Sequence, residues 1–180
     1  MLIVVAGPSG VGKGTVIREL LKKMPELHLE VSYTTRKPRP NEKNGIDYYF
    51  VSEKEFDKID FLESAEVHGN KYGTANREFK KDTVFEVDVQ GARSIKENRP
   101  DCLSIFLLPP SPGELEERLR KRNTENPEDI STRMETAKKE LKQRFDHDYI
   151  IVNNVLEHTV DKVLEVIKLE KKRKGSVKHE

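Results

Sequence analysis

The segment GPSGVGKGT (7–15) lies between an apolar run, LIVVA (2–6), and an amphipathic run that begins with Val16. Gly7 and Gly12, with four residues between them and Lys13 following, match the first part of the P-loop pattern, in its expected place between a strand and a helix. Glycines allow a tight turn whose successive N–H groups point to one place, and the helix N-terminus adds its positive dipole end. The segment therefore predicts a site for the phosphates of a nucleoside triphosphate.

We expect the whole loop to surround these phosphates, with the Lys13 ammonium reaching the β- and γ-phosphates. The residues predicted to bind the triphosphate are Gly7, Pro8, Ser9, Gly10, Val11, Gly12, Lys13, Gly14 and Thr15. A Ser or Thr directly after the lysine commonly ligates Mg²⁺, but here Gly14 takes that place and the hydroxyl comes at Thr15. The sequence therefore predicts a magnesium ion held through phosphate oxygens and water, with no protein metal ligand.

Short apolar runs alternate with helical patterns along the chain, which predicts an α/β fold with a parallel central sheet and flanking helices. The runs predicted to be buried strands are 2–6, 84–89, 103–108 and 149–152. Ser111 with Pro112 and Glu114 predicts a helix start, and Ser52 with Glu55 predicts another. At 180 residues the chain is long enough for one domain with a substantial core.

Two segments interrupt this alternation. Residues 32–82 contain short strands at 47–51, 61–67 and 70–74, which predicts a small mixed-sheet flap. Residues 121–132 are polar, contain Asn, Pro and Asp, and separate two helical runs, which indicates an irregular, mobile lid. The core is then formed by 1–31, 83–120 and 133–180.

The charges of the chain nearly balance, with 33 Lys and Arg against 32 Asp and Glu. This balance gives no overall field for nucleic acid or for an anionic membrane, so any anion must be held locally. The N-terminal apolar run is too short for a signal sequence or a membrane span. The single cysteine, Cys102, is compatible with a reducing compartment, and we expect a cytoplasmic protein in which Cys102 is a buried apolar residue.

A second anion site is predicted within the flap segment. Arg36 and Arg39 lie three residues apart and are followed by Tyr48. Paired guanidinium groups and a phenol suit a dianionic phosphate, and Tyr72 could add a further donor.

The chain resembles the guanylate kinase family. The motifs that carry the resemblance, in that family's order, are GPSGVGKGT, VSYTTRKPRPNEKNGIDYYFV, FLESAEVHGNKYGT, EVDVQGA, IFLLPPS and DYIIVNN. The resemblance implies a core, a GMP-binding region (32–82) and a lid (121–132) that close around the substrates ATP and GMP, with Mg²⁺. It places the following residues at the GMP site: Ser32, Arg36, Arg39, Tyr48, Glu63, Tyr72, Thr74 and Asp88.

The chemistry of these residues agrees with guanine. A carboxylate such as Glu63 can accept from the ring N1–H and the exocyclic amine, while Ser32 or Thr74 donates to the carbonyl. Adenine would leave the carboxylate unpaired, a mismatch that can reject an analogue by roughly 10⁴-fold. Asp88 could contact GMP or a water on magnesium, and the sequence does not separate these roles.

Phosphoryl transfer to GMP needs no general base, because the attacking phosphate oxygen is already anionic. The reaction requires charge neutralisation and alignment of two anions, which we assign to Lys13, Arg36 and Mg²⁺. By resemblance, Arg122 and Arg133 move in from the lid and stabilise the transferring group.

The chain differs from the family pattern at two places. Eleven residues separate Tyr72 from the strand that begins at 84, fewer than the family usually has, so we expect one flap helix to be reduced to a turn. The family usually shows Asn then Asp where this chain has Asn153 and Asn154, which leaves Asn154 without a predicted role.

Two alternatives stay open at this point: a guanylate kinase-like binding module without catalysis, and a P-loop kinase for another small phosphate acceptor. The sequence does not decide between a monomer and a homodimer.

Overall fold

The computed structural model describes residues 1–67, 69–121 and 127–176. Its centre is a five-stranded sheet in the order β2-β7-β1-β8-β9, in which every neighbouring pair is parallel. The strands are β1 (Leu2–Ala6), β2 (His28–Glu30), β7 (Thr83–Glu86), β8 (Leu103–Leu108) and β9 (Tyr149–Val152).

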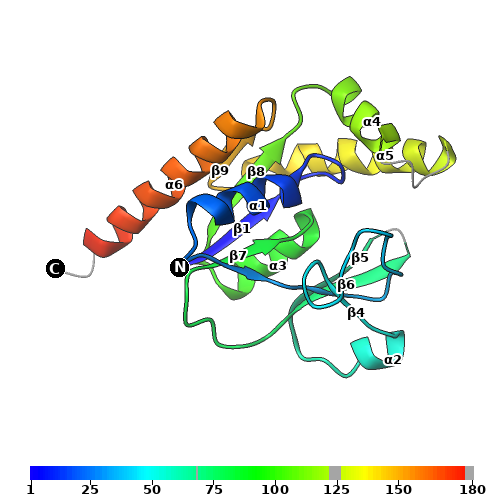
Figure 1. Ribbon diagram of the computed structural model, residues 1–180, viewed down its shortest axis with the longest axis horizontal. Coiled ribbons are helices and arrows are strands. Elements are labelled where there is room, and N and C mark those ends of the chain that lie inside the picture. The colour runs from blue at the N-terminus through cyan, green and yellow to red at the C-terminus, as the bar shows by residue number, and fades with distance from the viewer. Residues whose placement is uncertain (68, 122–126, 177–180) are drawn as a thin grey trace.

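Helices cover both faces of this sheet because alternate side chains of β1 point to opposite sides (Figure 1). Ile3 and Val5 belong to the apolar cluster shared with α1 (Lys13–Lys23) and α6 (Leu156–Ser176). Val4 and Ala6 belong to the cluster on the other face, which includes residues of α3 (Val89–Asn98).

A second, four-stranded sheet in the order β4-β3-β6-β5 stands beside the core. It consists of β3 (Tyr33–Thr34), β4 (Tyr49–Phe50), β5 (Phe61–Val67) and β6 (Asn70–Ala75), with α2 (Glu53–Phe56) at its edge. The β3–β4 pair is parallel and the other two pairs are antiparallel, so the sheet is mixed. Leu62 of β5 packs into the α3 cluster and ties the mixed sheet to the core.

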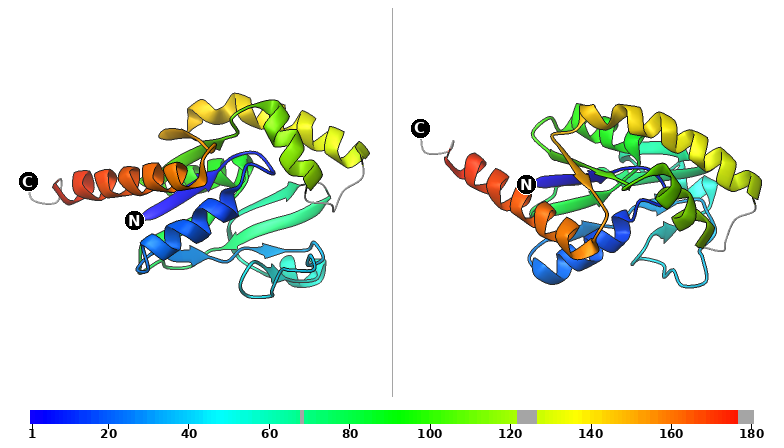
Figure 2. Two further views of the ribbon diagram at one scale, coloured as in Figure 1. Left: turned by 45° about the horizontal axis from the view of Figure 1, so that its top comes forward. Right: turned by 90° about the horizontal axis from the view of Figure 1, so that it is seen from above.

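Two further helices, α4 (Pro112–Lys121) and α5 (Pro127–Lys142), are followed by a short 3₁₀ helix, η1 (Gln143–Asp146). Figures 1 and 2 show that this pair of helices and the mixed sheet flank the same end of the parallel sheet, where β1 leads into α1. The carboxyl ends of parallel strands face this region, which is where ligands bind in open α/β folds.

The parallel sheet with flanking helices and the separate mixed sheet confirm the predicted fold class. Both predicted helix starts are also confirmed: Ser111 accepts from the Glu114 N–H at 3.1 Å, and Ser52 forms a complete capping box with Glu55. Residues 76–82 contain no helix, which agrees with the expected reduction of the flap. Cys102 is buried, and burial raises the pKa of its thiol to about 11.

Three details of the prediction were wrong. The strand expected at 84–89 ends at Glu86, because Asp88 instead caps α3 by accepting the Gly91 N–H at 2.8 Å. The short strands β2 and β3 were not predicted, since two or three residues show no periodicity. The segment 121–132 is not irregular throughout: Lys121 ends α4 and residues 127–132 begin α5, while 122–126 lie outside the described residues.

Among the described residues, none of the helices combines the length and the apolar composition that a membrane span requires.

Candidate active site

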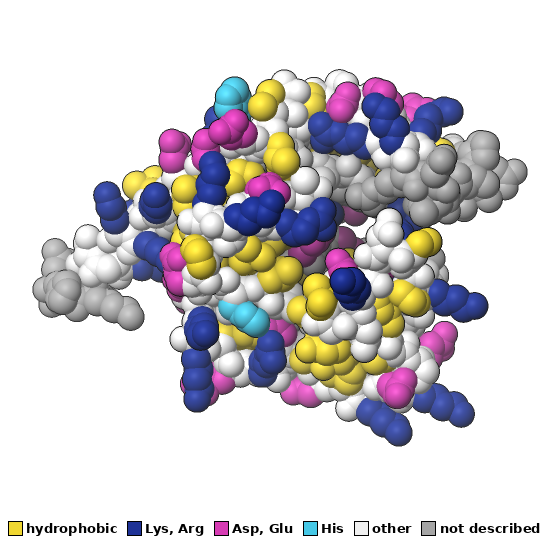
Figure 3. Space-filling model, viewed as in Figure 1, with side chains coloured by type: hydrophobic (Ala, Val, Ile, Leu, Met, Phe, Trp, Pro, Cys, Tyr) yellow, Lys and Arg dark blue, Asp and Glu magenta, His cyan; other side chains and the backbone are white. Residues whose placement is uncertain are grey.

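A cavity of about 800 Å³ separates the loop after β1 from the mixed sheet and is bordered by α5. Figure 3 shows the molecule hollowed between these two parts, with acidic side chains visible inside the hollow. The loop contributes Ser9 through Thr15 except Val11, and the mixed-sheet region contributes most of the residues predicted for the second substrate. The two predicted anion sites therefore face each other across one cavity.

The loop has the backbone conformation that its glycines permit. Gly7, Gly10 and Gly12 have φ angles of 146°, 87° and 101°, which side-chain-bearing residues rarely adopt. The Lys13 ammonium donates to the carbonyl of Gly7 at 2.7 Å and to that of Pro8 at 3.3 Å, so the lysine bends back over the loop. Gly7, Pro8 and Val11, which were predicted to bind phosphate, are buried and do not line the cavity.

Two residues that the sequence analysis did not assign brace this loop from behind. The buried Asn153 amide donates to the Val11 carbonyl at 2.8 Å, and the Arg118 guanidinium donates to the same carbonyl at 3.1 Å. Arg118 also donates to the Asn153 carbonyl at 3.1 Å. A Cβ on Gly12 would lie 2.7 Å from the Asn153 amide nitrogen, so the loop and this side chain are closely packed.

Helix α5 contacts the loop through two charged side chains on one face. Arg133 donates to the Ser9 hydroxyl at 3.1 Å, and Glu140 accepts from the Ser9 backbone N–H. Burial and the nearby Asp88 raise the pKa of Glu140 to about 7, although Lys13 opposes the shift. The structure thus places Arg133 beside the loop and adds Glu140 to the site. Arg122 lies outside the described residues.

The two arginines of the flap meet at one carboxylate, that of Glu42. Arg36 forms a bidentate pair with Glu42, with both N···O distances at 2.9 Å. Arg36 also donates to the Tyr72 hydroxyl at 3.2 Å, and its guanidinium lies 5.5 Å from the centre of the Tyr48 ring. Burial, with a smaller effect of Glu86, raises the pKa of Tyr48 above its usual value, so its phenol is a hydrogen-bond donor at neutral pH.

Glu63 is a buried carboxylate that faces the cavity, with 6% of its surface exposed. Burial and Asp88 raise its pKa to about 7, although hydrogen bonds from Thr74 oppose the shift. Thr74 is fully buried and lies behind the lining, where its hydroxyl is 3.3 Å from that of Ser32; Ser32 itself lines the cavity.

Asp88 completes this part of the site. One carboxylate oxygen caps α3, and the other, Oδ2, is buried without a hydrogen-bond partner among the described residues. An unpaired buried oxygen is costly, so Asp88 Oδ2 indicates a place for a ligand donor. Glu63 and Asp88 together form an acidic pocket suited to a base that presents N–H groups.

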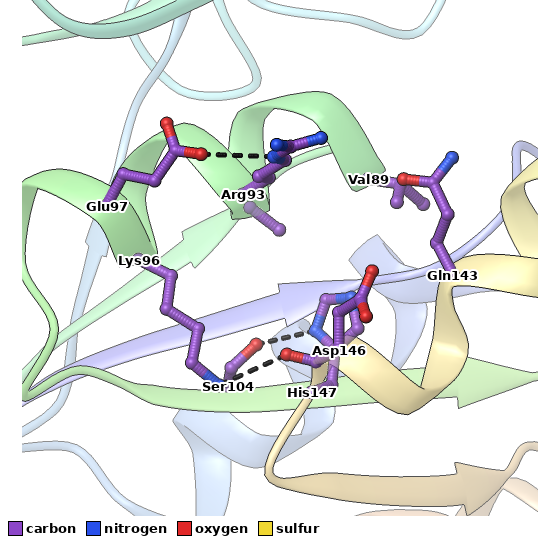
Figure 4. Close-up of a pocket in the computed structure, with 9 residues that line it drawn as sticks. Val89, Arg93, Lys96, Glu97, Ser104, Gln143, Asp146 and His147 are labelled. Carbon is purple, nitrogen blue, oxygen red and sulfur yellow. Dashed lines mark hydrogen bonds and ion pairs between the residues drawn. The ribbon is translucent and has the colours of Figure 1, made fainter.

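A second cavity, of about 420 Å³, lies between α3 and η1 and is separate from this site (Figure 4). At its base the Ser104 hydroxyl is 2.5 Å from Nδ1 of His147, whose ring packs against Phe106. Burial, helped by Lys96, lowers the pKa of His147 to about 4, so the ring is neutral at pH 7. Lys96 itself is paired with Asp148 at 2.9 Å.

The fold and the facing sites define a P-loop phosphotransferase that acts on a phosphate group. The family model described as guanylate kinase matches residues 1–170. The guanylate kinase of Prochlorococcus marinus is 46% identical over 177 residues, covering 93% of this chain and 96% of that protein. That of Thermobifida fusca is 44% identical, covering 92% and 90%. The chain belongs to the guanylate kinase family.

A solved structure supports the same assignment. The guanylate kinase of Anaplasma phagocytophilum superimposes with a TM-score of 0.77 at 32% identity, covering 94% of this chain and 85% of that one. These similarities favour neither a binding module without catalysis nor a kinase for another acceptor, the two alternatives that the sequence left open.

Proposed function

We propose that this chain transfers the γ-phosphoryl group of ATP to GMP, and to dGMP, giving ADP and the guanosine diphosphate. The observation that carries the proposal is the buried Glu63 in the same cavity as the Lys13 loop. Guanine N1–H and the exocyclic amine would pair with Glu63 and satisfy Asp88 Oδ2, and Ser32, which lines the cavity, would donate to the carbonyl. Adenine lacks this pair of adjacent donors.

The phosphate of GMP would bind at the arginine and tyrosine groups of the flap, with Arg36, Arg39, Tyr48 and Tyr72 as the donors. These four side chains are either cationic or phenolic, which suits a dianionic phosphate. An oxygen of this phosphate would attack the γ-phosphorus of ATP in line, without a general base. Lys13 and Arg133, which both contact the loop, would neutralise the charge that develops on the transferring group.

The residues around the loop fit a magnesium ion bound to the nucleotide. A Cβ on Gly14 would lie 3.0 Å from a carboxylate oxygen of Glu86, so this acid lies against the loop, and Asp88 lines the same cavity. Glu86 would accept hydrogen bonds from waters on the ion, and the phosphate oxygens would ligate it directly. When bound, Mg²⁺ screens the charge of the phosphates so that one anion can approach the other.

The division into a core, a flap (32–82) and a lid (121–132) is part of the proposal, as is a cytoplasmic location. Closure would bring the flap and the amino-terminal part of α5 toward the loop and exclude water from the transfer. Arg122 would enter the site in that step.

An acceptor panel tests the function. GMP, dGMP, AMP, UMP and CMP are offered separately with Mg-ATP, and ADP formation is measured in a coupled assay. We expect turnover with GMP and dGMP and at least 10³-fold lower kcat/KM with AMP. Turnover with only a non-guanine acceptor would refute the proposal. Absence of turnover with all five acceptors would refute it as well.

A variant pair tests the role of Glu63. Glu63→Ala should reduce the GMP-to-AMP ratio of kcat/KM, because the base then loses its acceptor. Glu66→Ala changes an exposed carboxylate on the same strand and serves as the control. A ratio equal to that of the unmodified protein in Glu63→Ala would remove Glu63 from guanine recognition.

A further inference from the structure

The carboxylate of Glu42 lies between the two arginines of the flap and contacts both. Its two oxygens pair with Arg36 Nη1 and Nη2 at 2.9 Å each. The same carboxylate accepts the Arg39 backbone N–H at 2.8 Å and the Arg39 guanidinium at 3.4 Å. Burial opposes ionisation, but the hydrogen bonds from Arg36 and Arg39 hold the pKa of Glu42 below its usual value. Glu42 is therefore charged at neutral pH.

A count of donors shows how fully Arg36 is engaged. A guanidinium group has five N–H bonds. Arg36 directs one to Tyr72, two to Glu42 and one to the Lys37 carbonyl at 2.7 Å. One N–H is left for a substrate. The side chain is also stacked near the Tyr48 and Phe50 rings, at 5.5 and 5.7 Å, and is 15% exposed.

The guanidinium of Arg39 is much less engaged than that of Arg36. Its guanidinium makes one longer contact with Glu42, and its side chain is 33% exposed, about twice the value for Arg36. Its position is set mainly through the backbone N–H bond to Glu42. Most of its donors therefore remain available on the side of the cavity.

We propose that Glu42 is a positioning residue: it holds Arg36 as a rigid support and orients Arg39, which with Tyr48 receives the phosphate of the acceptor. This inference rests on the proposed function and assigns different tasks to two arginines that the sequence treats alike. Fixing the donors before binding lowers the ordering cost that binding would otherwise carry.

Charge and geometry make opposite predictions for the loss of Glu42. Two guanidinium groups and one carboxylate carry a net charge of +1, and removal of the carboxylate would raise it to +2. If charge dominated, a variant without the carboxylate would bind the phosphate dianion more tightly. If positioning dominates, the same variant binds it more weakly, because Arg36 and Arg39 lose their common anchor.

The experiment compares Glu42→Gln with the unmodified protein in steady-state kinetics. We expect the KM for GMP to rise by about 10-fold or more, with a smaller change in kcat and an unchanged KM for ATP. Asp57→Asn is the matched control, since Asp57 forms an exposed ion pair with Lys71 in the same mixed-sheet region. An unchanged or lower KM for GMP in Glu42→Gln would overturn the proposal.

Chemical rescue separates positioning from general support of the fold. Glu42→Ala leaves a space between the two guanidinium groups that formate can fill. At constant ionic strength, formate should lower the KM for GMP in Glu42→Ala and have no such effect on the unmodified protein. A raised KM that formate leaves unchanged would assign Glu42 a role in stability alone and overturn the proposal.

Two measurements keep the outcomes distinct. Equilibrium binding of ATP to each variant shows that the P-loop side is intact. Calorimetric binding of GMP in the absence of ATP measures the affinity of the phosphate site without catalysis. If the unmodified protein binds GMP but shows no turnover, the kinase function is refuted. The GMP affinities of the Glu42 variants still test the role of Glu42 in that case.

Discussion

Gly91 provides the space that the carboxylate of Glu63 occupies. A Cβ on Gly91 would lie 2.7 Å from Oε2 of Glu63, closer than side-chain carbons approach other atoms. Gly91 lies in the first turn of α3, and its N–H donates a hydrogen bond to the Asp88 carboxylate. One residue without a side chain thus places both acidic groups of the predicted guanine pocket.

Gly91→Ala should weaken GMP binding without unfolding the protein. The added methyl displaces the end of the Glu63 side chain, which can move, while alanine favours the helix by about 1 kcal/mol over glycine. We expect the KM for GMP to rise by roughly 10-fold and the KM for ATP to stay constant. Gly113→Ala is the control, because Gly113 lies in the first turn of α4 and a Cβ there would meet only the Ser111 hydroxyl, at 3.9 Å. Equal KM values in the two variants would contradict the role of Gly91.

Glu63→Gln should stabilise the ligand-free protein at high pH. The folded-state pKa is about 7, above the ordinary 4.5, so the folded protein binds more protons than the unfolded chain between these values. Stability therefore falls as the pH rises from about 4.5 to about 7, and the loss remains above pH 7. Glutamine removes this loss. At pH 8, denaturant unfolding should show that the free energy of unfolding of Glu63→Gln is higher than that of the unmodified protein by roughly 1–3 kcal/mol. This difference should disappear near pH 4. A difference that does not change with pH would count against a buried, ionising Glu63.

Lys13→Ala should reduce kcat/KM by at least 10²-fold while the fold persists, because the lost ammonium would neutralise the transferring phosphoryl group. Lys13 also closes the loop through the Gly7 and Pro8 carbonyls, so the KM for ATP should rise as well. Lys22→Ala, on the exposed end of the same helix, controls for loss of a positive charge. Near-normal turnover in Lys13→Ala would exclude this lysine from the reaction.

His147→Gln should make the protein less sensitive to acid. The folded-state pKa of His147 is about 4, below the ordinary 6.5, so the folded protein binds fewer protons in this interval. Its contribution to stability is complete above about pH 6.5 and is lost as the pH falls toward 4. Glutamine at position 147 does not titrate, so it removes this dependence of the free energy of unfolding on pH. It does so even if the lost ring contact with Phe106 lowers the stability at pH 7. Unfolding curves at several pH values measure the slope, with His158→Gln on α6 as control; identical slopes for both variants would contradict the prediction.

The site was predictable from sequence where its parts are close together in the chain. The loop at 7–15 follows from glycine spacing, one lysine and the flanking strand and helix, all within some twenty residues. Arg36, Arg39 and Tyr48 likewise occur in one segment, so their common location at a phosphate site could be expected. The strands at 2–6 and 103–108 were recognisable because buried parallel strands are continuous apolar runs. The run at 149–152 is also a strand, but the prediction that it is buried was wrong: β9 is an edge strand, in which Ile150 and Val152 are 38% and 47% exposed.

Other features depend on contacts between distant segments and are decided only by the tertiary structure. The raised pKa of Glu63 arises first from burial and then from the nearby Asp88, and both depend on how the mixed sheet packs against the core. The support of Val11 by Asn153 joins residues 142 positions apart. The different tasks that we infer for Arg36 and Arg39 depend on which donors Glu42, Lys37 and Tyr72 engage. Sequence spacing encodes local backbone conformation and periodicity, whereas burial, charge proximity and donor saturation are properties of the packed chain.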